Sequence, residues 1–431
     1  SLGWNVAREN FWKPLESVVN QFKLRGSWGE LGNQNTSNLY PFYEILPVKS
    51  NSGNWLVNGG KTNTADIPSL VSTLLTWERV RSFNVGFDFG AFSNRLTGSF
   101  DYFVRKTVDM VGPAPQLPLV LGIAPAIVNN ADMKSYGFEI ELSWRDRIGE
   151  VDYGVKFNLA DAQQKVVKYP NTTNAFNDWY AGKMSGEIWG YTSLGIAKTD
   201  EEMKEHLASL PNGGQNQLGN KWGAGDIMYA DINGDGKVDG GKGTLADPGD
   251  QRIIGNSTPR YNFGLVLDAS YKGFDVSIFF QGVGKRDYAP IVGTNGAVFW
   301  GAVNNIWQSM AMEEHFDYFR PEGHPMGANL NGYYPRPDFT SNKNHQVQTR
   351  YLQDASYIRL KNLQIGYTLP KQWINKLHIN RCRVYVSGDN LWTGTSLASM
   401  FDPETLAAGD WGSGKTYPLS KVISFGLNVN F

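Results

Sequence analysis

Apolar and polar residues alternate with a period of two along much of the chain, a pattern typical of strands with one apolar face. The alternation recurs in segments of about ten residues, the length that crosses a hydrocarbon core when tilted. We therefore predict all-β structure, with antiparallel strands of a transmembrane β-barrel. The expected strands cover residues 22–31, 84–90, 96–105, 138–145, 151–159, 263–271, 274–281, 363–369, 381–390 and 423–431.

The connections between these segments fall into two unequal classes. Short turns are expected at residues 93–94, 146–149 and 272–273, and long excursions at 106–135, 161–258, 283–355 and 391–420. Outer-membrane barrels have short periplasmic turns and long extracellular loops. A soluble sandwich has no reason to sort its loops in this way, so the layout favours a barrel with long extracellular loops.

The two faces of the expected strands differ in chemistry. Charged residues occupy the polar positions, which would face a water-filled lumen: Glu139, Glu141, Arg145, Asp152, Lys156 and Asp268. Several apolar faces end in an aromatic residue, as an interfacial girdle requires: Tyr102, Trp144, Tyr153, Tyr271 and Tyr367. This division favours a wall with lipid on one side and water on the other.

The last strand carries the sharpest signal. From Ile423 to Phe431 an apolar residue occupies every second position, and the final residue is aromatic. A terminal Phe on such a strand resembles the signal read by the outer-membrane assembly machinery, so Phe431 is a candidate for that role. The alternative is an ordinary C-terminal strand of a soluble domain. In a barrel, this strand must pair with the first strand to remove the open edges.

Two short helices are expected. Thr199 to Glu202 forms a capping box, followed by an apolar face and a stop at Pro211. Residues 371–377 should form a second helix on the periplasmic side, after Pro370.

The composition argues against several other classes of protein. A net charge of −1 gives no basic excess, so nucleic acid is not an expected partner. One cysteine, Cys382, cannot form an internal disulfide. The ordinary mean hydropathy of −0.38 is also what an alternating barrel wall gives. Residues 1–5 lack the charged-then-apolar pattern of a signal peptide, so we expect any signal to lie upstream and the chain to be the C-terminal part of a longer protein.

Residues 231–239 match the first nine positions of a calcium loop of the EF-hand type. The twelfth position, where a carboxylate is expected, is Lys242, and residues 240–249 read as an insertion. The alternative is a solvated turn without metal. We expect a structural calcium ion in the loop region 231–250, held by Asp231, Asn233, Asp235, the Lys237 carbonyl, Asp239 and Asp250, or by Asp247 in place of Asp250.

No catalytic constellation is evident. The histidines are scattered, no HExxH spacing occurs, and no nucleophile elbow or phosphate-binding loop is present. We therefore do not expect an enzyme.

Nine segments of the chain have the character of family motifs. They are Lys23–Gln34, Asp231–Asp239, Asp250 with Ile253–Gly255, Pro259–Tyr261, Tyr271–Asp275, Phe279–Gly282, Tyr357–Asn362, Gly366–Pro370 and Arg383–Leu391. Together they resemble the SusC/RagA-type TonB-dependent transporters of the bacterial outer membrane, in which Lys23–Gln34 would correspond to a strand. The insertion after Asp239 departs from the family, in which the metal loop is contiguous.

The resemblance implies a 22-stranded barrel with an N-terminal plug and a TonB box. Residues 1–431 would hold about the last ten strands, with Leu2 to Asn5 ending an earlier strand. Residues 161–258 would form a long extracellular loop region. Such a piece cannot close a barrel alone, because it would leave two unpaired edges in lipid. The N-terminal portion of the same barrel is therefore an expected partner, together with outer-membrane lipid.

The resemblance also implies energised import of oligosaccharides or peptides, with a SusD-like lipoprotein as lid and TonB supplying the work through the missing N-terminal part. Tryptophans in the long loops are candidates for substrate contact, with loop-on-loop packing as the alternative: Trp179, Trp189, Trp222, Trp300, Trp307 and Trp411. The rival functions are a calcium-dependent adhesion or surface-binding protein, and an outer-membrane enzyme.

Overall fold

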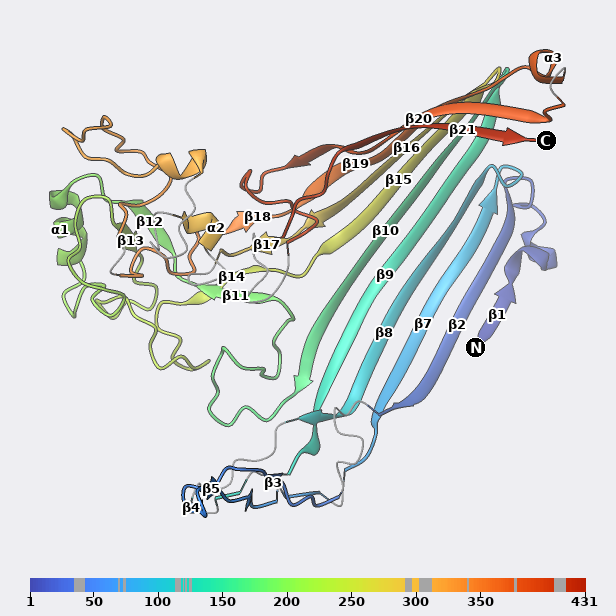
Figure 1. The fold of residues 1–431 in the computed structure, drawn as a ribbon. Helices are drawn as coiled ribbons and strands as arrows, with labels where there is room; N and C mark the ends of the chain where they lie inside the picture. The colour runs from blue at the N-terminus through green and yellow to red at the C-terminus, as the bar shows by residue number, and fades with distance from the viewer. Residues whose placement is uncertain are drawn as a thin grey trace.

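One large antiparallel sheet dominates the computed structural model (Figure 1). It has eleven strands in the order β1-β2-β7-β8-β9-β10-β15-β16-β19-β20-β21. The structure describes residues 1–34, 43–68, 70–72, 75–112, 118, 120, 122–123, 126–290, 297–301, 312–338, 341–375, 378–406 and 416–431. Short β1 (Leu2–Asn5) and β21 (Val422–Asn430) form the two edges.

Each expected strand is present, and most are longer than the alternation indicated. Their bounds are β2 Val19–Asn33, β7 Glu78–Ala91, β8 Leu96–Gly112, β9 Val128–Ile148, β10 Val151–Lys168, β15 Arg260–Tyr271, β16 Phe274–Lys285, β19 Tyr357–Thr368 and β20 Arg381–Thr395. The strand expectation is therefore confirmed.

Cross-strand register explains why the alternation survives across the whole sheet. Residues directly opposite each other in antiparallel strands point to the same face. One continuous row shows this: Leu96, Trp144, Val155, Leu267, Ile278, Leu363, Gly388 and Ile423 are successive partners. We call this apolar side the outer face and the opposite side the inner face. A slip of one residue in any pair would bring polar residues to the outer face.

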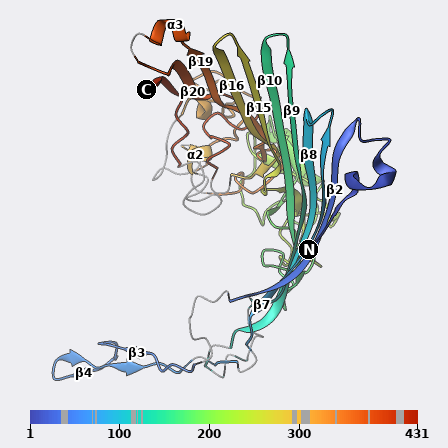
Figure 2. The same ribbon diagram turned by 90° about the vertical axis from the view of Figure 1, so that its right-hand side faces the viewer.

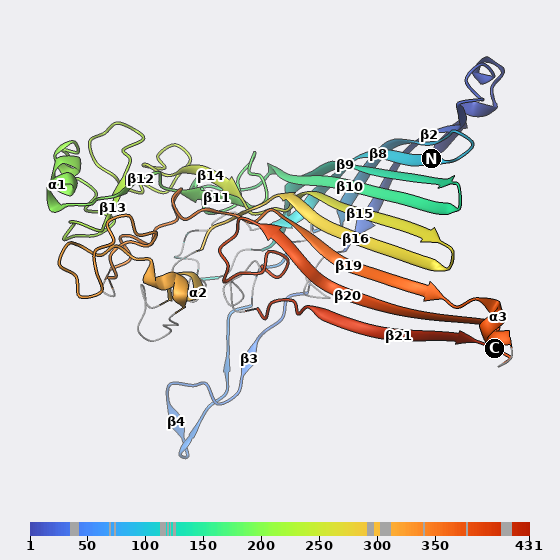
Figure 3. The same ribbon diagram turned by 90° about the horizontal axis from the view of Figure 1, so that it is seen from above.

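The tight turns all lie at one end of the sheet, and the long excursions lie at the other (Figure 3). Phe92, Ser93 and Asn94 take left-handed φ angles of 54°, 58° and 61° to reverse the chain between β7 and β8. Lys272 and Gly273, with φ angles of 46° and 90°, make the two-residue turn between β15 and β16. Positive φ at both central positions matches the strand twist, as in type I′ hairpins.

One expected excursion is much shorter than predicted. β8 continues to Gly112 and β9 begins at Val128, so half of residues 106–135 is strand. The backbone ladder continues here past the end of the apolar alternation, through register shifts between Thr107 and Val111. Conversely, the described residues between β2 and β7 form an excursion that the pattern did not indicate. It holds the two-residue strands β3 (Val48–Lys49), β4 (Leu56–Val57), β5 (Gly60–Lys61) and β6 (Thr64–Ala65), and it projects away from the sheet (Figure 2).

Both expected helices are present. In α1 (Asp200–Ala208) the Thr199 side chain accepts a hydrogen bond from Glu202 N at 3.1 Å. The Glu202 carboxylate accepts from Lys198 N rather than from the Thr199 amide of an ideal capping box. α3 covers Lys371–Ile374, and residues 376–377 lie outside the described part.

No helix in the described part of the chain is long and apolar enough to cross a membrane.

Changing Ile278 to Lys should destabilise the assembled protein in a lipid bilayer by about 2–4 kcal/mol, the cost of a cation near the middle of an outer apolar band. Ile278 lies on the outer face, four positions from the turn end of β16. The matched control is Ser277→Lys on the inner face, for which we expect a much smaller change. Urea unfolding of the intact protein in vesicles measures both, and equal effects would contradict the assignment of faces.

Candidate functional site

The inner face of the sheet is a polar wall held by ion pairs between strands. Arg25 on β2 contacts Asp88 on β7 at 2.9 Å and Asp101 on β8 at 2.8 Å. Arg383 on β20 pairs with Asp275 on β16. These ion pairs follow from the register of the strands, because strand pairing brings residues that are far apart in sequence together on the inner face. Partly exposed pairs of this kind contribute little to stability, but they keep the wall charged and hydrated.

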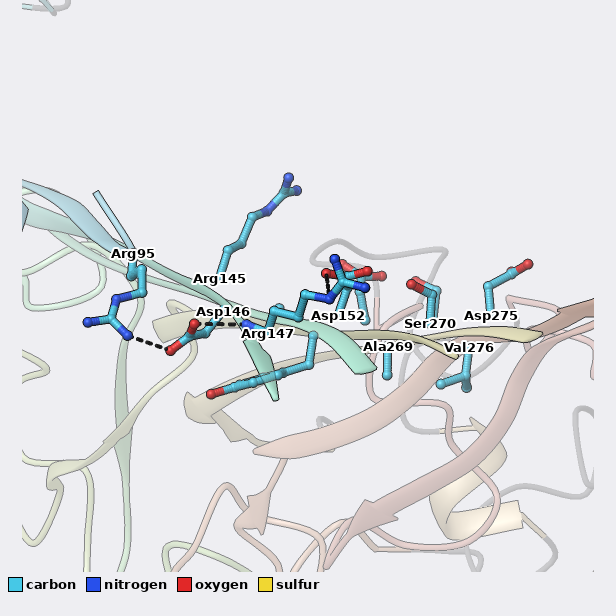
Figure 4. Close-up of a pocket in the computed structure, with 13 residues that line it drawn as sticks. Arg95, Arg145, Asp146, Arg147, Asp152, Ala269, Ser270, Asp275 and Val276 are labelled. Carbon is cyan, nitrogen blue, oxygen red and sulfur yellow. Dashed lines mark hydrogen bonds and ion pairs between the residues drawn. The ribbon is translucent and has the colours of Figure 1, made fainter. Parts of the chain in front are cut away.

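A hollow of about 650 Å³ lies near the tight-turn end of the wall, lined by residues of β9, β10, β15 and β16. On the inner face Arg147 approaches Asp152 at 3.7 Å, whereas Arg95 contacts Asp146, which the register places on the outer face, at 3.0 Å. Arg145 instead extends away from the sheet (Figure 4). The hollow is open and charged, which suits a hydrated surface better than a closed ligand pocket.

The long excursions pack together into a compact unit at the far end of the sheet. We call this unit the loop domain: the described residues between β10 and β15, between β16 and β19, and residues 396–406. Its small sheets pair β11 (Glu187–Gly190) with β14 (Arg252–Asn256), β12 (Ser193–Ile196) with β13 (Ile227–Tyr229), and β17 (Asp287–Tyr288) with β18 (Gln353–Asp354).

The core of the loop domain is aromatic. Its centre is Phe299 in α2 (Ala297–Trp300), whose ring contacts Tyr334, Tyr351 and Phe401 at centroid distances of 5.4, 5.9 and 6.3 Å. Phe299, Tyr334 and Tyr351 lie in the excursion between β16 and β19, Phe401 lies in the one after β20, and Phe299 is fully buried. The loops therefore form a folded domain that is built by tertiary contacts between distant segments.

A buried carboxylate ties two of the excursions together. Asp226 is fully buried and accepts hydrogen bonds from Lys343 Nζ, Arg336 and the Asn344 amide, each at 2.9 Å. Lys343 is only 1% exposed, and its ammonium lies 5.0 Å from the Trp222 ring centroid. Removing one partner would leave the other charge buried and uncompensated, which is strongly destabilising. Sequence spacing gave no signal for this hub, because more than a hundred residues separate its members.

The segment 396–406 is anchored on the wall at the loop end. Arg359 on β19 contacts Asp402 and Glu404, both at 2.7 Å, and Lys361 contacts Glu404 at 2.6 Å. Burial is the largest single effect and acts to raise the pKa of Asp402. The hydrogen bond from Arg359, those from the Glu404 and Leu419 amides and the charge of Arg359 together outweigh it, so the pKa lies below its ordinary range. Arg286 adds contacts to the carbonyls of Ser257, Pro403 and Leu406. The segment is thereby fixed against the inner face.

The candidate metal residues do lie in one loop. Asp250 N donates to Asp239 O at 2.9 Å, so residues 240–249 bulge out and return to the same place. The Asp231 carboxylate accepts from Gly234 N and Gly236 N at 2.6 and 2.8 Å. Gly234 and Gly236 take the left-handed conformation that this turn requires.

Two of the expected ligands are occupied by other partners. Asp250 is fully buried, and its oxygens accept from the amides of Ile232 at 2.7 Å and Asp239 at 2.8 Å. Lys237 Nζ lies 2.5 Å from Asp239, and this hydrogen bond lowers the pKa of the Asp239 carboxyl. Within the described residues, no three His, Cys, Asp or Glu side chains gather in a way that could hold a metal ion. This arrangement does not fit a preformed metal shell, and calcium binding stays a prediction.

The candidate tryptophans divide by exposure. Trp300 is fully buried in the loop core, as the packing alternative predicts. Trp189 stacks on Phe176 at 4.6 Å, and Trp222 is half-buried beneath Lys343. Trp179 is 38% exposed and is the most accessible of the four described. Trp307 and Trp411 lie outside the described residues. Substrate contact stays a prediction, carried best by Trp179.

His345 is a buried residue that the sequence did not single out. It is 1% exposed, its ring lies 4.5 Å from the Trp300 ring centroid, and neither ring nitrogen has a hydrogen-bond partner among the described residues. Burial lowers the pKa of His345 to about 4, against an opposing effect of Asp338. The neutral ring is therefore the form that the loop core accommodates.

Acidification should loosen the loop domain. In the folded protein the pKa of His345 lies below the ordinary value of His. The stability that comes from keeping this ring neutral is therefore complete above that ordinary value and is lost as the pH falls toward 4. At pH 5 the loss is on the order of 2 kcal/mol. Hydrogen exchange of residues 343–351 at pH 7 and pH 5, corrected for intrinsic rates, measures this. His345→Asn should lack the added pH dependence, and the same dependence in both proteins would contradict the assignment.

Calcium titrated into chelator-treated protein should release or absorb heat in a calorimeter, provided that calcium displaces the Lys237 ammonium from Asp239. Asp231→Ala should abolish this signal, because it removes the first ligand. Glu205→Ala, an exposed carboxylate change on α1, serves as the control and should leave the signal unchanged. No heat with the unaltered protein would refute the calcium prediction.

Comparisons with known proteins agree on one family. Residues 4–391 match the family model described as TonB dependent receptor-like, beta-barrel. TonB-dependent receptor P3 of Formosa agariphila is 29% identical over 100% of this chain, which covers 41% of that receptor. TonB-dependent receptor SusC of Bacteroides thetaiotaomicron is 22% identical over 100% of the chain, which covers 39% of that protein.

Among solved structures, the RagAB peptide transporter superposes with a TM-score of 0.72 at 22% identity, covering 100% of this chain and 43% of that one. The RagAB peptide importer in the open-open state gives a TM-score of 0.71. At this identity the likeness shows the fold. The chain spans about two fifths of the length of the relatives that it matches.

Proposed function

Because the chain belongs to the TonB-dependent receptor-like β-barrel family, we propose that it serves TonB-dependent import of large nutrients, oligosaccharides or peptides, across the outer membrane. The outer-membrane location follows from the family, and the outer and inner faces of the sheet match it. In this proposal the inner face lines the lumen, and an N-terminal portion of the same barrel supplies the remaining strands and the contact with TonB.

The observation that carries the proposal is the polar inner wall beneath a folded loop domain. A conduit for large solutes needs a hydrated wall, and here Arg25, Asp88 and Asp101 keep that wall charged. Solute capture needs an ordered extracellular surface, and the aromatic core around Phe299 supplies the order. The loop domain also offers a platform for a SusD-like lid lipoprotein, which we include as a partner.

Two rival functions make different predictions. A calcium-dependent adhesion protein does not need a polar inner wall paired with an apolar outer face. An outer-membrane enzyme needs a catalytic group, and the perturbed residues described here, such as Asp402 and His345, pack in buried clusters. The comparisons likewise name receptors and transporters. We therefore propose import in preference to these two functions.

Purification of the intact protein from its own outer membrane in mild detergent tests the proposal. We expect a surface lipoprotein to co-purify in a fixed ratio, together with bound oligosaccharides or peptides that mass spectrometry identifies. Trp179→Ala should lower the amount of bound solute several-fold without affecting the lipoprotein. Recovery of the protein in water without detergent, or with neither lipoprotein nor solute, would refute the proposal.

A further inference from the structure

Four basic residues lie side by side across β7, β8, β9 and β10. In the register of the sheet Arg81 is the partner of Lys106, Lys106 of Lys134, and Lys134 of Lys165. Directly opposed residues share a face, with Cβ atoms about 4.5–5.5 Å apart. The strands therefore bring together cations from four separate segments of sequence into one row.

This row is on the outer face. On each strand, the residue two positions nearer the tight turns points to the same face as the cation. These residues are Phe83, Val104, Tyr136 and Gln163, which are again successive partners. Phe83 is 46% exposed on this face. Lys134 Nζ lies 5.2 Å from the Tyr136 ring centroid, so its stem runs along the aromatic edge of the apolar surface. The cations thus begin where the apolar surface ends.

The height of the row matches a membrane boundary. On β9 the outer apolar residues run from Trp144, which Arg95 contacts at the tight-turn end, to Tyr136. Lys134 is ten positions from Trp144, or about 33 Å along the strand. A tilt of about 40° reduces this to about 25 Å, the height of the apolar band in outer-membrane barrels. The lysines therefore lie at the head groups of the outer leaflet, on the side of the long loops.

Three of the four cations have no ionic partner within the part of the chain that the structure describes. Arg81 pairs with Glu30 at 2.6 Å, at the end of the row. Lys106, Lys134 and Lys165 form no ion pair among the described residues. Like charges on directly opposed strands destabilise a sheet, so such a row is expected to have an anion between its members. The three lysines span about two strand spacings, roughly 10 Å, which fits one sugar–phosphate head group.

We propose that Lys106, Lys134 and Lys165 bind the phosphate of the outer-leaflet glycolipid at the wall of the barrel. The lipid chains would lie on the apolar surface below Phe83 and Tyr136, and the phosphate would accept hydrogen bonds from the lysine ammonium groups. The site is on the face opposite the lumen, and at Lys165 it borders the loop domain, whose Met184 forms a β-bridge with that residue. It gives this side of the barrel a fixed lipid neighbour, whatever solute the protein imports.

The test uses the intact protein, stripped of lipid by detergent exchange, and titration with purified phosphorylated glycolipid under native mass spectrometry. We expect the triple change Lys106→Gln, Lys134→Gln and Lys165→Gln to weaken binding. Each lysine near an anionic membrane surface is worth roughly fivefold in affinity, so the loss is on the order of 100-fold. A control with the same charge change places Gln at the exposed loop lysines Lys198, Lys204 and Lys221, and should bind as the unaltered protein does.

Two further arms identify the ligand. Enzymatically dephosphorylated glycolipid should bind the unaltered protein as weakly as the phosphorylated lipid binds the triple variant. Inorganic phosphate at millimolar concentration should not displace the lipid, because it lacks the apolar contacts. Heat-modified gel mobility shows that each variant is a folded barrel. Equal lipid binding by the triple variant and its control, or equal binding of the dephosphorylated lipid, would overturn the proposal.

Discussion

The cross-strand register is the constraint on which the rest of this structure depends. A backbone in lipid has no water to bond, so each strand must satisfy its amides and carbonyls with its neighbours. Once β8 to β21 pair, the row from Leu96 to Ile423 fixes which side chains meet lipid. The same register brings Arg25 to Asp88 and Asp101, and Arg383 to Asp275, on the other face. One ladder therefore defines both surfaces.

The loop domain is stabilised by a different kind of interaction. Its segments lack the continuous ladder of the wall, and its order comes from aromatic contacts around Phe299 and from the buried Asp226 hub. Arg286 and Arg359 connect this domain to the strands below it. The wall is thus held by uniform backbone pairing, and the loop domain at its end is held by specific side-chain packing. Both are required for solute capture above a hydrated lumen.

The sequence was sufficient for the strands, the tight turns and both helices, because these depend on local alternation and on residues such as Lys272-Gly273. It was insufficient wherever partners are distant. The Asp226–Lys343 pair, the Arg359–Asp402 anchor and the lysine row on β8 to β10 come from residues that only the register or the loop packing brings together. Strand ends were also underestimated, since the ladder of β8 and β9 continues where the apolar pattern stops. Trp300 follows the packing alternative that the sequence left open, because an aromatic residue in a loop can be core.

The central claim is that one face of this sheet meets lipid and the other meets water. Spin labels attached to single cysteines at consecutive positions 362–368 of β19, beyond the register shift at Lys361, test it most directly in intact protein reconstituted in vesicles with Cys382 replaced by Ser. We predict that accessibility to oxygen and to a water-soluble nickel chelate alternates out of phase with a period of two. Oxygen contact should be highest at Leu363 and Ile365, and chelate contact highest at Gln364. Accessibility to the chelate at every position, or at none, would contradict the account.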